Sequence, residues 1–107
     1  MKITIILSTS NTETNWNAFR LANLALKDAD NVSVFLIGEG VEYLKSSSNK
    51  FDVQKQVELF LAANNGKILA CETCMKSRNQ GSDKTCPVSG IQDLYTLIRD
   101  SDKVITF

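Results

Sequence analysis

Cys71 and Cys74 are separated by two residues and lie where the apolar run 68–70 gives way to the basic, helix-compatible stretch 75–78. A thiol at the end of a buried strand, facing the first turn of a helix, lies among backbone N–H groups that lack partners, at the positive end of the helix dipole. Because the thiolate is the reactive form of cysteine, this arrangement predicts a nucleophilic sulfur at Cys71. The chain contains no histidine, so its sulfur chemistry must proceed without an imidazole.

Two cations follow the cysteine pair directly. Lys76 and Arg78 would favour an anion on Cys71, or a bound persulfide, if their side chains turn toward the sulfur. Basic residues in such a stretch usually form a solvated surface. Their position beside the thiols is what makes them candidates for the site.

Each thiol also has a simpler interpretation. Cys71 could be a small buried hydrophobic residue that ends a strand. Cys74 could face the core, close a disulfide with Cys71, or support it. Cys86, which precedes the only proline, Pro87, lies in a polar segment and could be a resolving thiol or incidental.

Metal binding and a thioredoxin-like active site fit the sequence less well. Structural zinc takes four ligands, and the three cysteines would need a carboxylate such as Asp83 to complete the set. The cysteine pair follows a third strand, with no aromatic residue before it and no Gly-Pro inside it, which argues against a thioredoxin-like motif. We therefore predict neither a metal nor a cofactor.

The chain of 107 residues predicts a single domain, 1–107. Its 12 basic and 12 acidic residues leave no net charge and no basic stripe, which argues against nucleic-acid binding and is compatible with self-association. The apolar run at the N-terminus is too short for a signal peptide or a membrane span. These features predict a cytoplasmic protein with reduced thiols, bound neither to nucleic acid nor to a membrane.

Apolar runs alternate with amphipathic stretches along the chain, a pattern typical of an α/β domain. Strands are predicted at residues 2–7, 32–37, 67–70 and 104–107. Helices are predicted at 13–28, from 53 to the turn at 64–66 and after residue 89, with a short helical segment at 41–45.

Capping patterns and apolar spacing set the expected ends and faces of these helices. Ser10 with Glu13, and Ser89 with Gln92, have the spacing of capping boxes, and Asp52 is an expected N-cap. The faces expected to be buried are Ala18, Leu21, Ala22, Ala25 and Leu26 in the first helix, Val53, Val57, Phe60 and Leu61 in the second, and Ile91, Leu94, Tyr95 and Ile98 in the third.

This order of elements implies a mainly parallel sheet of four to five strands, with helices on both sides and right-handed crossovers. Sites in open sheets of this kind form outside the carboxyl ends of the strands. The loop 8–12, the turn 38–41 and the Cys71 junction are all predicted to lie at that edge. We therefore expect three separate loops to converge where the thiols are.

The order and spacing of several segments resemble the DsrE-like family, the sulfur-relay proteins that include the TusD relatives. The clearest is the cysteine segment 68–78, Ile-Leu-Ala-Cys-Glu-Thr-Cys-Met-Lys-Ser-Arg. Residues 16–22 resemble the first helix of the family, 34–41 its second strand and turn, and 86–89 and 102–107 its closing segments. The resemblance covers nearly the whole chain.

The resemblance implies a three-layer α/β/α domain, often assembled as trimers or hexamers, that passes sulfur between proteins as a cysteine persulfide. The sulfur-bearing cysteine of the family stands seven residues before an arginine, which here gives Cys71 and Arg78. Cys74 matches only those relatives that carry a Cys-x-x-Cys pair. Where the family commonly has glycine, this chain has Glu72 and Asn79, and a carboxylate at residue 72 would raise the pKa of the neighbouring thiol.

Together, the residues and the resemblance predict a small homo-oligomeric sulfur carrier in which Cys71 holds sulfur and passes it between donor and acceptor proteins. Cys74 would assist or release the sulfur, and Lys76, Arg78 and Cys86 would bind the substrate or a partner. Two other functions stay open: a dithiol–disulfide oxidoreductase or redox sensor that uses Cys71 and Cys74, and a non-catalytic oligomeric binding subunit. Whether the protein is an enzyme also stays open, because thiol exchange needs no acid–base residue of its own.

Overall fold

The computed structural model describes residues 1–45, 47–79 and 88–107. Its elements in chain order are β1 (Lys2–Leu7), α1 (Thr12–Lys27), β2 (Asn31–Leu36), the 3-10 helix η1 (Gly38–Glu42), α2 (Val53–Ala62), β3 (Gly66–Cys71), α3 (Glu72–Ser77), β4 (Val88–Ser89), α4 (Ile91–Asp100) and β5 (Lys103–Thr106). None of the described helices is both long and apolar enough to cross a membrane.

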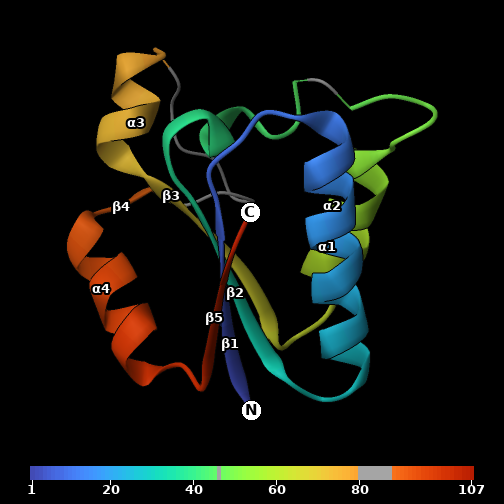
Figure 1. Cartoon of the computed structure of the whole chain (residues 1–107), viewed down its shortest axis with the longest axis vertical. Coiled ribbons are helices and arrows are strands. Elements are labelled where there is room, and N and C mark those ends of the chain that lie inside the picture. Colours follow the sequence, from blue (N-terminus) through green and yellow to red (C-terminus); the bar gives the residue numbers. More distant parts are fainter. Residues whose placement is uncertain (46, 80–87) are drawn as a thin grey trace.

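Across the described residues, five parallel strands form one sheet in the order β4-β3-β2-β1-β5. Helices α1 and α2 cover one face of the sheet and α4 covers the other, while α3 lies beyond the carboxyl end of β3 (Figure 1). The predicted three-layer α/β/α fold with a mainly parallel sheet is confirmed.

The predicted strand boundaries agree with β1, β2, β3 and β5 to within one residue, because apolar and β-branched residues predominate in each of these strands. The edge strand β4 was not predicted, since two residues are too few to show a periodic pattern. β4 pairs with β3 so that Val88 lies opposite Ala70 and Ser89 lies opposite Cys71.

The N-cap of α1 differs from the prediction. Asn11 rather than Ser10 is the cap, and its Oδ1 accepts the N–H of Thr14 at 2.9 Å. Asn and Ser are equally good caps, so composition alone does not decide between adjacent candidates. Asp52 caps α2 as predicted and accepts the N–H of Lys55 at 3.0 Å.

The start of α4 also differs by one residue. Gly90 rather than Ser89 is the N-cap, and the carboxylate of Asp93 accepts the N–H of Gly90 at 2.9 Å. Ser89 is unavailable as a cap because it is paired in β4 opposite Cys71. The acidic side chain in the first turn replaces the predicted Gln92 as the partner of the cap.

The core between the sheet and the α1–α2 layer is built on aromatic rings. Phe19 stacks on Tyr43 with ring centroids 5.9 Å apart and meets Phe60 edge-on at 5.6 Å. Leu21 was predicted to lie on the buried face of α1 but is exposed, whereas Phe19, which is not part of that predicted face, is buried. The large ring of Phe19 sets the rotation of α1 about its axis. The predicted stripe of α2 is buried or half-buried.

The apolar residues predicted to form the buried face of α4 are mostly exposed. Leu94 alone among them is buried, while Ile91 and Tyr95 are each 62% exposed and Ile98 is 42% exposed. Leu94 and Leu97 turn toward the sheet instead. We call the uncovered row of Ile91, Tyr95 and Ile98 the α4 face.

Candidate functional site

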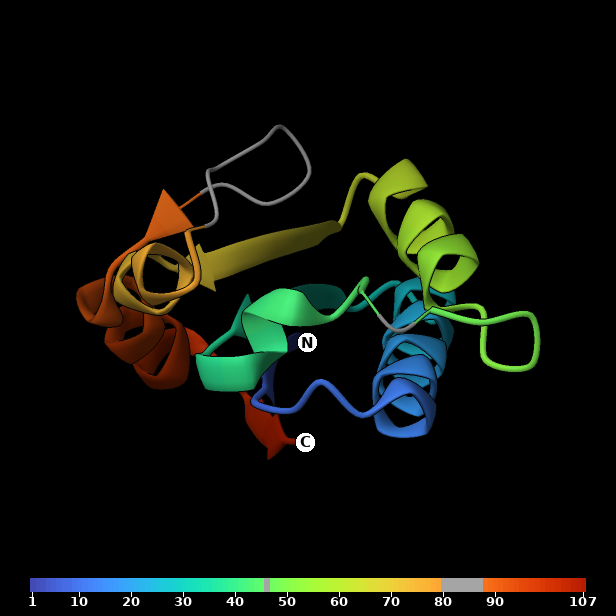
Figure 2. The ribbon, with the colours of Figure 1, turned by 90° about the horizontal axis from the view of Figure 1, so that it is seen from above.

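The segment after β1, η1 and the β3–α3 junction meet at the carboxyl edge of the sheet, as predicted (Figure 2). Gly40 allows this approach, because a Cβ atom there would overlap the carbonyl oxygen of Leu7. The N–H of Ile37 donates to the same carbonyl at 3.0 Å. Gly38 has a φ of 57°, which glycine adopts without strain. These contacts hold η1 against the end of β1, beside α3.

Cys71 ends β3 and is the N-cap residue of α3. Its side chain is only 7% exposed and packs with Phe35 and Leu94 between the sheet and α4. The sequence placed this thiol correctly at the strand–helix junction. The apolar cover supplied by α4 was not predicted.

Cys74 lies in the first turn of α3 and is more exposed than Cys71. It is in contact with both apolar clusters, the one under α1–α2 and the one under α4. Its sulfur accepts the backbone N–H of Gly38 at 3.2 Å. An N–H donor at this distance can stabilise negative charge on sulfur. Cys74 therefore bridges α3 and η1.

The pKa of Cys71 is raised above its usual value, mainly because burial disfavours the charged thiolate. A hydrogen bond with the Cys74 side chain raises the pKa further, while the backbone N–H groups of Cys74 and Thr73 oppose the shift. Those N–H groups form no regular N-cap bond to the sulfur, so burial outweighs them. The expectation of a stabilised anion on Cys71 is thus wrong, because the thiol is buried beneath α4.

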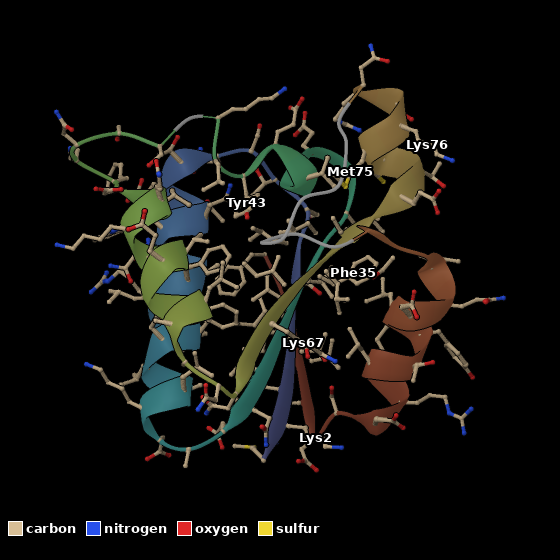
Figure 3. All side chains as sticks on the ribbon, turned by 180° about the vertical axis from the view of Figure 1, so that it is seen from behind. Lys2, Phe35, Tyr43, Lys67, Met75 and Lys76 are labelled. Carbon is tan, nitrogen blue, oxygen red and sulfur yellow. The ribbon has the colours of Figure 1, made fainter. Side chains whose placement is uncertain are left out.

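Lys76 forms an ion pair with Glu72, whereas it was considered from the sequence as a group that would favour an anion on Cys71. Its ammonium group lies 2.9 Å from the carboxylate of Glu72, and both side chains are exposed. Figure 3 shows Lys76 on the outer side of α3 and Met75, which is buried, on the inner side. The pairing and the surrounding solvent screen the charge of Glu72, and Glu72 is not among the causes of the raised pKa of Cys71.

Arg78 connects α3 to η1. One guanidinium N–H donates to the carbonyl oxygen of Cys74 at 3.2 Å, and Nε lies 3.7 Å from the carboxylate of Glu42 in η1. Glu42 also pairs with Lys45 at 3.0 Å. Because η1 carries Gly38, this link helps to keep the Gly38 N–H on the sulfur of Cys74. Arg78 thus acts through the backbone and η1.

Asn79 follows the end of α3 with a φ of 54°, in the left-handed region. The family resemblance leads us to expect glycine here, and asparagine is the residue that most often replaces glycine at such a helix end. The departure at residue 79 therefore preserves the backbone conformation. Cys86 and the suggested metal ligand Asp83 lie outside the described residues.

Three residues of the candidate site were not predicted from the sequence. Gly38 and Gly40 were interpreted only as a tight turn, yet Gly38 provides the N–H partner of Cys74 and Gly40 allows η1 to approach β1. Glu42 joins them as the partner of Arg78. Two glycines at the carboxyl end of a parallel strand were the available signal, since backbone often approaches a site closely there.

These observations define a class: an α/β domain with a pair of thiols at the carboxyl edge of a parallel sheet. The model of the DsrE/DsrF-like family matches residues 1–107, and the chain belongs to this family.

Two uncharacterized archaeal proteins and one solved structure are similar to this chain. The chain is 29% identical to the uncharacterized protein MJ0989 of Methanocaldococcus jannaschii, with all of both chains covered. It is 29% identical to the uncharacterized protein MK0008 of Methanopyrus kandleri, with 98% of this chain and 93% of the relative covered. The crystal structure of the ychN protein from E. coli has the same fold, with a TM-score of 0.81, 21% identity and all of both chains covered.

Proposed function

We propose that this protein carries sulfane sulfur as a cysteine persulfide on the Cys71–Cys74 pair and passes it from a donor protein to an acceptor protein. The observation that carries the proposal is the hydrogen-bonded contact of two thiols at the carboxyl edge of the sheet, with backbone N–H groups beside both sulfurs. Membership of the DsrE/DsrF-like family supports it. We also propose that the protein is cytoplasmic, because thiols are kept reduced in that compartment.

The environment of the pair suits sulfur transfer better than acid–base catalysis. A persulfide is held and released by attack of one sulfur on another, at rates set by nucleophilicity and by the pKa of the leaving thiol. Backbone N–H groups supply fixed partial positive charge without a titratable residue. This agrees with a chain that has no histidine. Cys71, on which the family resemblance places the sulfur, and Cys74 are the two candidate carriers.

A dithiol–disulfide oxidoreductase is the second candidate. The observation that favours it is the same thiol–thiol contact at a spacing of three residues, which suits a reversible disulfide. The burial of Cys71 beneath α4 is the feature that a binding subunit with inert thiols would share.

The carrier is expected to gain the mass of one sulfur atom when the reduced protein is incubated with a cysteine desulfurase and cysteine. Intact and peptide mass spectra detect the gain. Trypsin leaves Cys71 and Cys74 in one peptide and Cys86 in another, so each spectrum contains its own reference thiol. The gain should disappear when Cys71 and Cys74 are both replaced by serine.

Other results would support the other functions. Formation of a Cys71–Cys74 disulfide in the absence of any sulfur adduct, at any time point, would point to an oxidoreductase. No adduct, no disulfide and protection of the thiols from alkylation would leave a binding subunit and contradict the proposal.

We also propose that copies of the chain associate through the α4 face, as the family resemblance implies for trimers or hexamers. Three large side chains at helical spacing are exposed there, which a domain of neutral net charge tends to cover by self-association. Aromatic residues such as Tyr95 are enriched at the centres of interfaces of this kind.

Tyr95→Glu is expected to reduce the molar mass measured by size-exclusion chromatography with light scattering, because a carboxylate cannot be buried in an apolar interface without a partner. Thr96→Glu adds the same charge to the side of α4 away from this face and should leave the mass unchanged. A monomeric wild-type protein, or equal behaviour of the two variants, would rule out this interface.

A further inference from the structure

The two thiols of the pair differ in access to other molecules. Cys74 is partly exposed at the seam between α3 and η1, whereas Cys71 is 7% exposed beneath α4, against Phe35 and Leu94. A sulfur donor must bring its own sulfur into contact with the thiol that attacks it. Of the two thiols, Cys74 is therefore the more accessible to a donor.

The surroundings of Cys74 are also suited to hold charge. The N–H of Gly38 donates to its sulfur at 3.2 Å and would remain beside a persulfide formed there. The position of this N–H is fixed from two sides: Gly40 packs on the carbonyl of Leu7, and Glu42 is bound to Arg78 at the end of α3. The Gly38 N–H therefore needs no rearrangement to stabilise negative charge that develops on the sulfur.

Cys71 is placed for a later step. Its raised pKa keeps the thiol protonated, which makes it a poor first nucleophile. Its side chain is nevertheless hydrogen-bonded to that of Cys74, so it lies next to the inner sulfur of any persulfide that forms on Cys74. The N-cap residue and the third residue of a helix are at the spacing found in reversible Cys-X-X-Cys disulfides.

We infer that Cys74 receives the sulfur and that, when no acceptor protein takes it, Cys71 displaces it as hydrosulfide and leaves a Cys71–Cys74 disulfide. The inference rests on the proposed persulfide function and assigns an order to the two thiols. It reverses the assignment that the family resemblance gives, in which Cys71 holds the sulfur.

The displacement balances without a further reagent. The sulfur of Cys71 forms a bond to the inner sulfur of the Cys74 persulfide, and the bond from that inner sulfur to the outer sulfur breaks. The proton of Cys71 goes to the departing sulfur, which leaves as HS⁻ with the electron pair of the broken bond. The two cysteine sulfurs are oxidised to a disulfide, and the sulfane sulfur is reduced to sulfide. Each reduced chain discharges one sulfur.

The test loads reduced, desalted protein with a cysteine desulfurase and cysteine, with no added reductant, and follows hydrosulfide release together with peptide masses. A reaction without the protein gives the background release. The wild-type chain should release close to one hydrosulfide per chain and form the Cys71–Cys74 disulfide. Cys71→Ser should keep one extra sulfur on Cys74 and release none. Cys74→Ser should take up sulfur at least about tenfold more slowly than the wild type.

Two sets of results would overturn the inference while leaving the proposed function intact. One is rapid loading of Cys74→Ser with the extra sulfur on Cys71. The other is a stable persulfide on the wild-type chain with no hydrosulfide above background. If no form of the protein takes up sulfur, the proposed function fails as well. Cys71→Ala, compared with Cys71→Ser by circular dichroism, shows whether a polar group at the buried site has unfolded the chain.

Discussion

Phe35→Ala is expected to lower the free energy of unfolding by about 3–5 kcal/mol, the usual cost of deleting a buried aromatic ring. Phe35 is fully buried between the sheet and α4 and is the largest side chain in the cluster that contains Cys71 and Leu94 (Figure 3). Denaturant unfolding followed by circular dichroism measures the loss. A change below about 1 kcal/mol would mean that the ring is not packed as described.

The same ring influences the chemistry of Cys71, and the milder Phe35→Leu tests this. Burial is the main cause of the raised pKa of Cys71, so looser packing that admits water should lower that pKa toward its usual value. Alkylation of Cys71 by iodoacetamide should then begin at a lower pH. Phe60→Leu, at a fully buried ring in the other cluster, is the matched control and should leave the pH profile unchanged.

The raised pKa of Cys71 also makes the free energy of unfolding depend on pH. The folded chain holds the proton of Cys71 more tightly than the unfolded chain does, because its pKa is raised. The stabilisation is therefore complete below the ordinary thiol pKa and is lost as the pH rises through the folded value. In Phe35→Leu this contribution shrinks, so its stability should fall less steeply in the alkaline range than that of Phe60→Leu.

Gly40→Ala should be the most damaging glycine substitution at the site. The added Cβ would overlap the backbone carbonyl of Leu7, which cannot rotate away, and overpacking of this kind costs about 1–3 kcal/mol or more. To relieve the overlap, η1 must move away from β1, and the Gly38 N–H moves away from Cys74 with it. Unfolding curves and the hydrogen-exchange rate of the Gly38 amide measure the two effects.

Gly38→Ala provides the control for this prediction. A Cβ at Gly38 meets nothing within 4 Å, so the substitution adds only backbone strain from the positive φ, about 1 kcal/mol. The N–H remains on Cys74, and its exchange should stay slow. Equal stability losses in the two variants, or slow exchange of the Gly38 amide in Gly40→Ala, would contradict the close contact between η1 and β1.

The elements that the sequence predicts well are those whose patterns are local. β1 consists mainly of apolar and β-branched residues, and α2 has its stripe and its Asp52 cap within a single stretch of chain. The prediction of the buried side of α4 was wrong for a physical reason. Periodicity aligns Ile91, Tyr95 and Ile98 on one face of the helix. Which face meets the sheet depends instead on Leu94 and Leu97, which pack into the cluster between α4 and the sheet.

The candidate site divides in the same way. The strand–helix junction at Cys71 follows from the residues around it and was predicted correctly. The raised pKa of Cys71 depends on Phe35 and Leu94, which come from distant elements, so it could not be predicted from the residues around Cys71. The bond from Gly38 to Cys74 joins residues 36 positions apart, and no local pattern encodes such a contact.

The short length of α3 has a consequence for how Cys71 meets solvent. A helix of six residues is not stable by itself, so α3 persists only through its tertiary contacts, chiefly buried Met75 and the link from Arg78 to Glu42. Local unfolding of α3 is therefore expected to need less free energy than global unfolding, and it would loosen the cover of Cys71 from the α3 side while α4 stays packed against the sheet. The rate of alkylation of Cys71 at neutral pH is then expected to report on that opening equilibrium. Weakening the Arg78 link would accelerate the reaction without unfolding the sheet.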